Sequence, residues 1–250
     1  MFAATITRSF FFSIVFFISY DGVSQKATLP KWEAGINAGA YIYQGDLTIH
    51  PIGSVETIRP GFGLSVTRII SSAFSARLMF NMAKIAADES IYNTPKFRQH
   101  RNLAFNASVK ELGLSVHWNV FGTNYDNVKF QPYVFAGAGV SFVNITRDYS
   151  GFNMAYFGPE SSVTRGLATD VATAPPKVIA VIPVGGGIRY NISDRLVANI
   201  EGTYRLMRTD YLDGFSQAAN PNMKDHYSSL TIGIAYKFGS RDRYGCPTAN

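Results

Sequence analysis

Residues 229–238 read SLTIGIAYKF, a segment in which large apolar side chains alternate with small or polar ones. The apolar set, from Leu230 to Phe238, occupies one parity, and the set from Ser229 to Lys237 occupies the other. Because successive side chains of a β-strand point to opposite faces, this segment predicts a strand with one apolar face. A soluble β-sandwich produces the same alternation, so the pattern is informative only where it recurs beside a secretion signal and between loops of alternating length.

The alternation recurs in seven further segments, at residues 32–43, 62–66, 74–82, 103–120, 134–142, 184–190 and 196–206. The connections between segments are alternately long (44–59, 86–100, 147–176, 209–226) and short (70–73, 122–129, 191–194). This arrangement is typical of outer-membrane barrels, in which long loops are extracellular and short turns periplasmic. The sequence therefore predicts an all-β fold, a transmembrane antiparallel up-and-down β-barrel of eight strands. Its apolar parity faces lipid, and Phe238 ends the last strand at an aromatic girdle.

One segment departs from a single parity. In residues 103–120, Leu103, Phe105 and Ala107 occupy odd positions, whereas the apolar residues from Leu112 to Val120 occupy even ones. An extra residue in a strand shifts the facing of the side chains that follow it. The sequence therefore predicts a β-bulge at residues 109–111.

The N-terminal residues have the features of a secretory signal. Arg8 precedes the apolar run Phe10 to Tyr20, and Gly22-Val23-Ser24 follows as a small-x-small cleavage pattern. A membrane anchor needs about 20 apolar residues, so this run is too short for one. We expect a signal peptide at 1–24, a barrel at 25–239 and a periplasmic tail at 240–250.

The net charge of +6 is scattered along the chain. Cleavage after residue 24 removes one basic and one acidic residue, so the charge does not change. Without a basic run, the pattern favours anionic lipid headgroups or an acidic protein partner over nucleic acid. The single cysteine, Cys246, lies in the tail and cannot form an internal disulfide, so it is either an exposed thiol or a contact to a periplasmic partner.

Charged residues also occur on the parity opposite to lipid. An eight-stranded barrel is only about wide enough for its own side chains, so these charges must pair inside it. We expect a structural network of ion pairs that plugs the lumen, with a gated conduction path as the alternative. The predicted network consists of Arg77, Glu111, Arg189, Glu201, Arg205 and Lys237.

The residues offer little evidence for catalysis. Ser115 and His117 share a face, but it is the lumen face, whereas a lipid-modifying hydrolase needs its Ser, His and carboxylate at the bilayer rim. Asp210, Asp213 and Asp225 bracket the last long loop and either bind a divalent cation or belong to a solvated loop. We favour the solvated loop, and expect no enzyme activity, no cofactor and no metal.

Six segments occur in this order along the chain: Tyr43-Gln44-Gly45-Asp46-Leu47, Arg59-Pro60 through Gly63-Leu64, Phe74-Ser75-Ala76-Arg77-Leu78, Arg101-Asn102-Leu103-Ala104-Phe105 with Glu111-Leu112, Gln131-Pro132-Tyr133-Val134-Phe135, and Thr209-Asp210-Tyr211-Leu212-Asp213. Together they resemble the PorG-like outer-membrane barrels of the type IX secretion system. The resemblance implies a small barrel without catalytic residues that anchors or assembles the periplasmic ring of a secretion and gliding apparatus.

We therefore expect a monomeric barrel in the outer membrane of a Gram-negative bacterium, with both termini in the periplasm. Its expected partners are outer-membrane lipid and periplasmic secretion-ring proteins. The alternatives are a structural or adhesion barrel that acts through its extracellular loops, a small pore, and a lipid-modifying enzyme.

Overall fold

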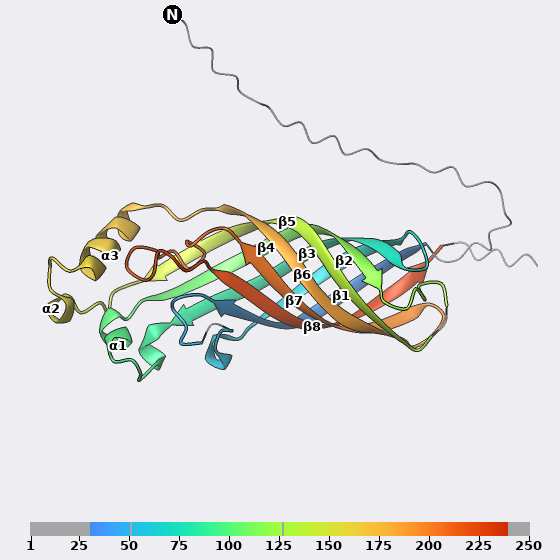
Figure 1. Cartoon of the computed structure of the whole chain (residues 1–250), viewed down its shortest axis with the longest axis horizontal. Helices are drawn as coiled ribbons and strands as arrows, with labels where there is room; N and C mark the ends of the chain where they lie inside the picture. Colours follow the sequence, from blue (N-terminus) through green and yellow to red (C-terminus); the bar gives the residue numbers. More distant parts are fainter. Residues whose placement is uncertain (1–30, 51, 127, 240–250) are drawn as a thin grey trace, which may run out of the picture.

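Eight antiparallel strands, paired in sequence order, close into one barrel (Figure 1). The computed structural model describes residues 31–50, 52–126 and 128–239, so the predicted signal peptide (1–24), the tail (240–250) and Cys246 lie outside the described residues. The strands are β1 (Trp32–Gln44), β2 (Arg59–Ile69), β3 (Phe74–Asp88), β4 (Ala104–Asn119), β5 (Phe130–Asp148), β6 (Val178–Asn191), β7 (Leu196–Met207) and β8 (His226–Phe238). The predicted eight-stranded up-and-down barrel is confirmed.

The barrel closes where its first strand meets its last. β1 and β8 pair along their whole length, from Trp32 opposite Phe238 to Gln44 opposite His226. Every strand therefore has a neighbour on both sides, which removes the open edges that a sheet of this size would otherwise expose.

The two ends of the barrel differ. One end, the turn end, carries the short connections 70–73, 120–129 and 192–195, together with the start of β1 and the end of β8. The other, the long-loop end, carries the connections 45–58, 89–103, 149–177 and 208–225 (Figure 1). These connections contain η1 (Val55–Thr57), η2 (Glu89–Ile91), α1 (Phe97–Arg101), α2 (Met154–Phe157) and α3 (Ser162–Ala172). None of the described helices is long and apolar enough to cross a bilayer.

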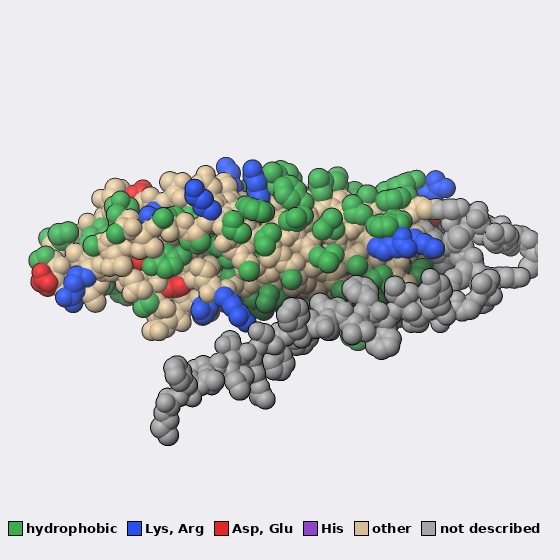
Figure 2. Space-filling model, turned by 90° about the horizontal axis from the view of Figure 1, so that it is seen from above, with side chains coloured by type: hydrophobic (Ala, Val, Ile, Leu, Met, Phe, Trp, Pro, Cys, Tyr) green, Lys and Arg blue, Asp and Glu red, His purple; other side chains and the backbone are tan. Residues whose placement is uncertain are grey.

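The outside of the barrel carries a band of exposed apolar side chains, which we call the apolar belt. Figure 2 shows these side chains along the flank of the barrel, with Lys and Arg toward both of its ends. The belt contains, among others, Ile36, Phe62, Leu64, Leu78, Leu114, Val116, Val134, Ile188, Ile200, Leu230, Ile232 and Ile234. The parity predicted to face outward therefore does so.

The predicted bulge in β4 is wrong. Register with both neighbours is uninterrupted, from Ala104 to Asn119 against β5 and from Ala104 to Trp118 against β3. Phe105 and Ala107 point into the barrel and are buried, while Asn106 and Ser108 are exposed on its outside. The apolar parity changes because β4 leaves the apolar belt, so that its outer face is polar and its inner face is apolar.

The lengths of the central strands support this explanation. β3, β4 and β5 contain 15, 16 and 19 residues, whereas a transmembrane strand needs about 9–11. These strands extend past the belt toward the long loops. The third strand runs to Asp88, so the loop predicted to begin at residue 86 starts later.

The interior has two zones along the barrel axis. An apolar cluster, which includes Tyr43, Ile85, Phe105 and Phe215, fills the half next to the long loops. Charged and polar side chains, including Arg77 and Glu201, fill the half next to the turns.

Candidate functional site

The six charged residues predicted for the lumen all lie on inward-facing, buried positions. Arg77 Nη1 lies 2.7 Å from Glu201 Oε2, and Arg205 Nε lies 2.7 Å from Glu111 Oε2. Each pair joins strands that are not neighbours, so the contacts cross the lumen.

Further hydrogen bonds satisfy the two acids. Glu111 accepts from Asn81 Nδ2 at 3.0 Å and from the Tyr227 hydroxyl at 2.6 Å. Glu201 accepts from the Tyr133 hydroxyl at 2.7 Å. A buried ion pair is stable only when its remaining polar atoms are also satisfied, and these tyrosines meet that requirement.

The prediction missed one acid. Glu33 forms an ion pair with Arg189, and Lys237 Nζ donates to Asn191 Oδ1 at 2.9 Å. Glu33 lies on the inward parity of β1, between the outward-facing Trp32 and Ala34. The period-2 pattern that located the other charges could therefore also have located Glu33.

Ser115 and His117 are the nearest approach to catalytic residues in the described lumen. Ser115 Oγ lies 2.9 Å from His117 Nε2, and the imidazole stacks on Phe135. His117 Nδ1 has no hydrogen-bond partner among the described residues, so no carboxylate orients the ring as a triad requires. The adjoining cavity, of about 10 Å³, has room for about one water molecule.

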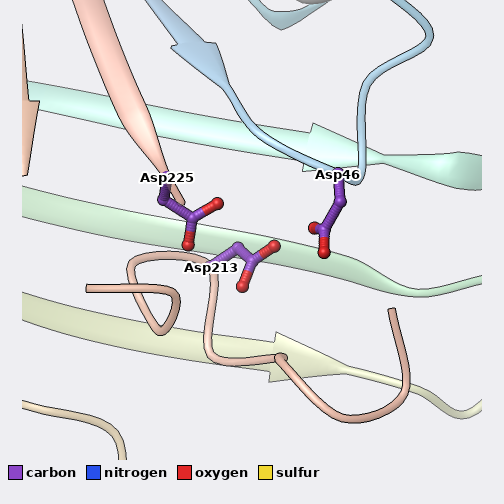
Figure 3. Close-up of side chains that lie close together, drawn as sticks. All are labelled: Asp46, Asp213 and Asp225. Carbon is purple, nitrogen blue, oxygen red and sulfur yellow. The ribbon is translucent and has the colours of Figure 1, made fainter. Parts of the chain in front are cut away.

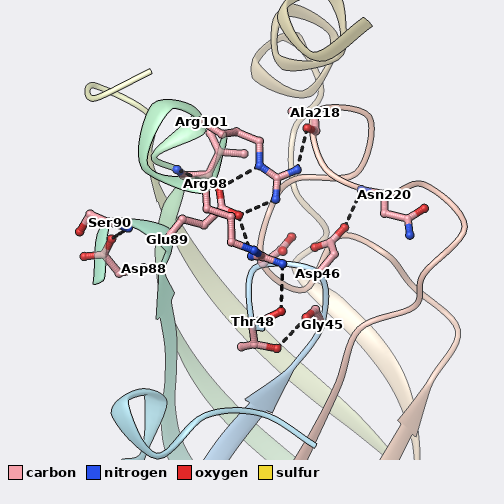
Figure 4. A network of polar contacts seen from close by, with 12 residues as sticks. Gly45, Asp46, Thr48, Asp88, Glu89, Ser90, Arg98, Arg101, Ala218 and Asn220 are labelled. Atoms are coloured by element: carbon pink, nitrogen blue, oxygen red, sulfur yellow. Dashed lines mark hydrogen bonds and ion pairs between the residues drawn. The ribbon is translucent and has the colours of Figure 1, made fainter. Parts of the chain in front are cut away.

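Ion pairs and hydrogen bonds fix the long-loop end. Glu89 of η2 accepts from both Arg98 and Arg101 of α1, at 2.8 Å from Arg98 Nη1 and 2.8 Å from Arg101 Nε. Arg101 also donates to Ala218 O, and Arg98 donates to Thr48 O (Figure 4). Glu89 therefore links connections 45–58, 89–103 and 208–225.

A second acid holds the last long connection against α3. Asp170 is completely buried, and its carboxylate accepts from the backbone N–H groups of Ser216, Gln217 and Ala218 at 3.1, 3.1 and 2.8 Å. The Tyr211 hydroxyl donates to the same group. The long connections thus form a cap with a defined conformation over the barrel mouth.

Three further acids converge inside this cap. Asp46, Asp213 and Asp225 each offer one carboxylate oxygen, and these oxygens lie within 4.8 Å of one another (Figure 3). The interpretation of Asp213 and Asp225 as solvated is wrong, because Asp213 is completely buried and Asp225 nearly so. The third predicted acid, Asp210, is not a member of the cluster and accepts from the Ser216 hydroxyl.

Burial shifts the pKa values of the clustered acids. It raises the pKa of Asp46 to about 6, against the opposing effects of the Asn220 N–H and the Arg101 charge. Burial and the negative charges of Asp225 and Asp46 raise the pKa of Asp213 well above its usual range. Burial also raises the pKa of Asp225 well above its usual range. The hydrogen bonds and charges around the cluster therefore do not compensate for the cost of ionising all three buried carboxyl groups.

A family model described as a domain of unknown function, DUF6089, matches residues 8–246. The chain belongs to this family. The match spans all eight strands of this DUF6089 barrel. It also includes the cap, with Glu89, Asp170 and the cluster of Asp46, Asp213 and Asp225. No curated protein matches the sequence at a significant level.

Several solved barrels share features of the fold with this DUF6089 chain. Neisserial surface protein A is 13% identical, covering 83% of this chain and 97% of its own, with a TM-score of 0.46. Ail of Yersinia pestis, solved with a heparin analogue, is 12% identical over 83% of this chain and 99% of its own, with a TM-score of 0.44. OprG of Pseudomonas aeruginosa is 13% identical over 85% and 98%, also with a TM-score of 0.44.

Proposed function

We propose that the protein is a non-enzymatic, monomeric barrel of the outer membrane that anchors or assembles the periplasmic ring of a type IX secretion and gliding apparatus. The apolar belt supports the membrane location. A closed barrel satisfies all of its backbone groups internally, as the hydrocarbon core of a bilayer requires, and the belt presents apolar side chains to lipid.

The edge of the belt at the turn end supports the same location. Aromatic side chains gather there, and cations stack on two of them: Arg68 lies 4.7 Å from the Trp32 ring and Lys129 lies 5.7 Å from the Tyr190 ring. Aromatic girdles mark the interfaces of membrane barrels, and the adjacent cations suit anionic headgroups. The girdle comprises Trp32, Phe74, Trp118, Phe130, Tyr190, Tyr236 and Phe238.

The filled lumen favours a scaffold over a pore. The ion pairs of Arg77, Arg189 and Arg205 cross it, and the apolar cluster occupies the other half. Within the described residues, the polar half of the lumen thus adjoins an apolar half, which opposes the passage of hydrated solutes.

The proposal that partners bind at the turn end rests on one observation. Each short turn exposes a large apolar side chain. Ile70, Phe121 and Ile192 are 61%, 68% and 46% exposed at the end of the barrel that we assign to the periplasm. Large apolar side chains exposed on every turn of this end favour a protein contact there. The resemblance to PorG-like barrels favours secretion-ring proteins, with the tail 240–250 and Cys246 as additional contacts.

Site-specific crosslinking in intact cells tests this proposal. Photoreactive residues at Ser72 and Asp126 of the turn end should trap periplasmic ring proteins, and those at Ser90 and Ser150 of the long-loop end should not. The triple variant I70S/F121S/I192S should lose these adducts while it stays folded. The matched control I52S/V55S changes exposed apolar residues of the long-loop end and should keep them.

A second candidate is an adhesion or structural barrel that acts through its loops. The fixed conformation of the cap favours it, because a preorganised surface loses less entropy on binding. Adducts with extracellular molecules from Ser90 and Ser150, with none from Ser72 and Asp126, would support this candidate and contradict the anchoring role.

A further inference from the structure

The acidic cluster lies at the seam where the barrel closes. Asp46 follows the end of β1, and Asp225 immediately precedes β8, so both adjoin the last pair of the seam, Gln44 and His226. Asp213 reaches them from the connection between β7 and β8 (Figure 3). A ligand bound by all three would tie this connection to both strands of the seam.

Each of the three carboxylates is oriented in the same way. One oxygen accepts from a backbone N–H: Asp46 Oδ2 from Asn220 at 2.7 Å, Asp213 Oδ1 from Phe215 at 2.8 Å and Asp225 Oδ2 from Leu212 at 3.0 Å. The other oxygens of Asp213 and Asp225 both face the single Tyr43 hydroxyl, whereas that of Asp46 has no partner among the described residues. Hydrogen bonds that fix the outer oxygen of a ligating carboxylate are typical of metal sites.

The central oxygen of Asp46 has no partner. Asp46 is 7% exposed, and its Oδ1 accepts no hydrogen bond from the described residues. Its neighbours Asp213 and Asp225 are 0% and 1% exposed. An unpartnered carboxylate oxygen in such a place is unfavourable unless a cation or a proton meets it.

The surrounding side chains do not supply that cation. Within the described ranges, no Lys, Arg or His nitrogen lies within 4.0 Å of the three carboxylates. Arg101, whose charge acts on Asp46, is bonded to Glu89 and to Ala218 O. The Tyr43 hydroxyl lies 2.8 Å from Asp213 Oδ2 and 2.5 Å from Asp225 Oδ1, and its single proton can serve only one of them.

We propose that Asp46, Asp213 and Asp225 bind one calcium ion, which holds the cap to the seam between β1 and β8. The donor atoms are all oxygen, which selects a hard cation over zinc or copper. The three oxygens lie within 4.8 Å of one another, and oxygens around calcium lie up to about 5 Å apart, so calcium fits between them. Magnesium usually keeps several waters and is bound through one or two carboxylates, so three protein carboxylates favour calcium. This assignment goes beyond the proposed function and does not depend on it.

Calorimetry on the full-length mature protein in detergent, stripped with EDTA, tests the proposal. Calcium should bind saturably at one ion per barrel, and magnesium should bind at least about tenfold more weakly. D46N and D213N should each lose about tenfold or more in calcium affinity. D148N is the matched control, because Asp148 is exposed at the same end and lies outside the cluster, and it should bind as the unaltered protein does.

Thermal unfolding separates a metal site from a merely structural role. In EDTA, D46N should unfold at a higher temperature than the unaltered protein, because one of three repelling carboxylates is gone. Calcium, at a concentration that saturates only the unaltered protein, should raise the unfolding temperature of that protein and leave that of D46N nearly unchanged. A variant that lost stability equally in both conditions would contradict the proposal. So would the absence of saturable calcium binding, tighter binding of magnesium, or unchanged calcium binding by D213N.

Terbium luminescence provides a measurement that does not depend on stability. Terbium replaces calcium at oxygen sites and emits when a nearby tyrosine is excited, and the ring of Tyr43 adjoins the cluster. Calcium should displace terbium from the unaltered protein and from D148N, and the emission of both should then fall. Emission of equal strength from D213N would overturn the assignment.

Discussion

Arg205 on β7 and Glu111 on β4 form an ion pair across the lumen, with 2.7 Å between Nε and Oε2, although 94 residues separate them in the chain. Arg77 with Glu201 and Arg189 with Glu33 cross the lumen in the same way. Opposite walls of the barrel are therefore linked by charge pairs, and the lumen is part of the core that stabilises the fold.

Glu111→Ala should destabilise the barrel strongly. The substitution leaves the buried Arg205 guanidinium without its counter-charge, and breaking a buried pair in this way costs about 3–5 kcal/mol. Urea unfolding in detergent or liposomes measures the loss. Glu160→Ala removes the partner of the exposed Arg165 and should produce no measurable change. Equal stability of E111A and the unaltered protein would show that the lumen pairs do not stabilise the fold.

Planar bilayers containing the purified barrel should show no steady ion conductance. The crossing ion pairs and the apolar cluster obstruct the lumen, and the cavity beside His117 has a volume of only about 10 Å³. A detergent preparation without protein gives the baseline. Discrete conductance steps whose number increases with the amount of barrel added would contradict the scaffold interpretation and favour the small pore.

A charge introduced into the apolar belt should lower the free energy of unfolding, and the loss should be larger the closer the charge lies to the bilayer centre. Leu114→Arg places a cation on the lipid-facing side of β4, where the cost is about 2–4 kcal/mol near the bilayer centre. Ser108→Arg lies on the same face of the same strand, past the belt, and should cost about 0–1 kcal/mol. Folding into liposomes under a urea titration compares them. Similar costs for the two variants would place the membrane boundary elsewhere on β4.

Asp170→Ala should release the last long connection from α3. The backbone N–H groups of the buried Ser216 and Ala218 and of the exposed Gln217 lose their acceptor, at about 1–3 kcal/mol for each buried group left unsatisfied. Hydrogen–deuterium exchange should show faster exchange at Ser216, Gln217 and Ala218, with the strands unchanged. Asp148→Ala, an exposed acid of the same end, is the control. Unchanged protection in D170A would contradict the role given to this carboxylate.

The strands could be predicted because lipid and lumen impose opposite requirements on alternate residues. Outward positions such as Leu230 and Ile232 are apolar, and inward positions such as Thr231 are small or polar, so the period-2 pattern is visible without knowledge of neighbours. The same rule misled us at residues 103–120, because the sequence does not mark where β4 passes out of the apolar belt.

The site depended on information that is not local. Asp213 and Asp225 lie in one connection and were predicted as a group, but Asp46 joins them only because β1 closes against β8. Likewise the pairing of Arg189 with Glu33 depends on the stagger of the closed barrel. The short helices α1 and α2, of five and four residues, are stabilised by contacts such as that of Arg101 with Glu89 rather than by their own propensity.

The pairing of the first strand with the last also governs biogenesis. A chain cut short before residue 226 lacks β8, so β1 and β7 would each present an unpaired row of N–H and C=O groups that a bilayer cannot solvate. A partly made chain therefore cannot form a barrel that a bilayer accepts. Membrane insertion should accordingly be coupled to the pairing of β1 with β8.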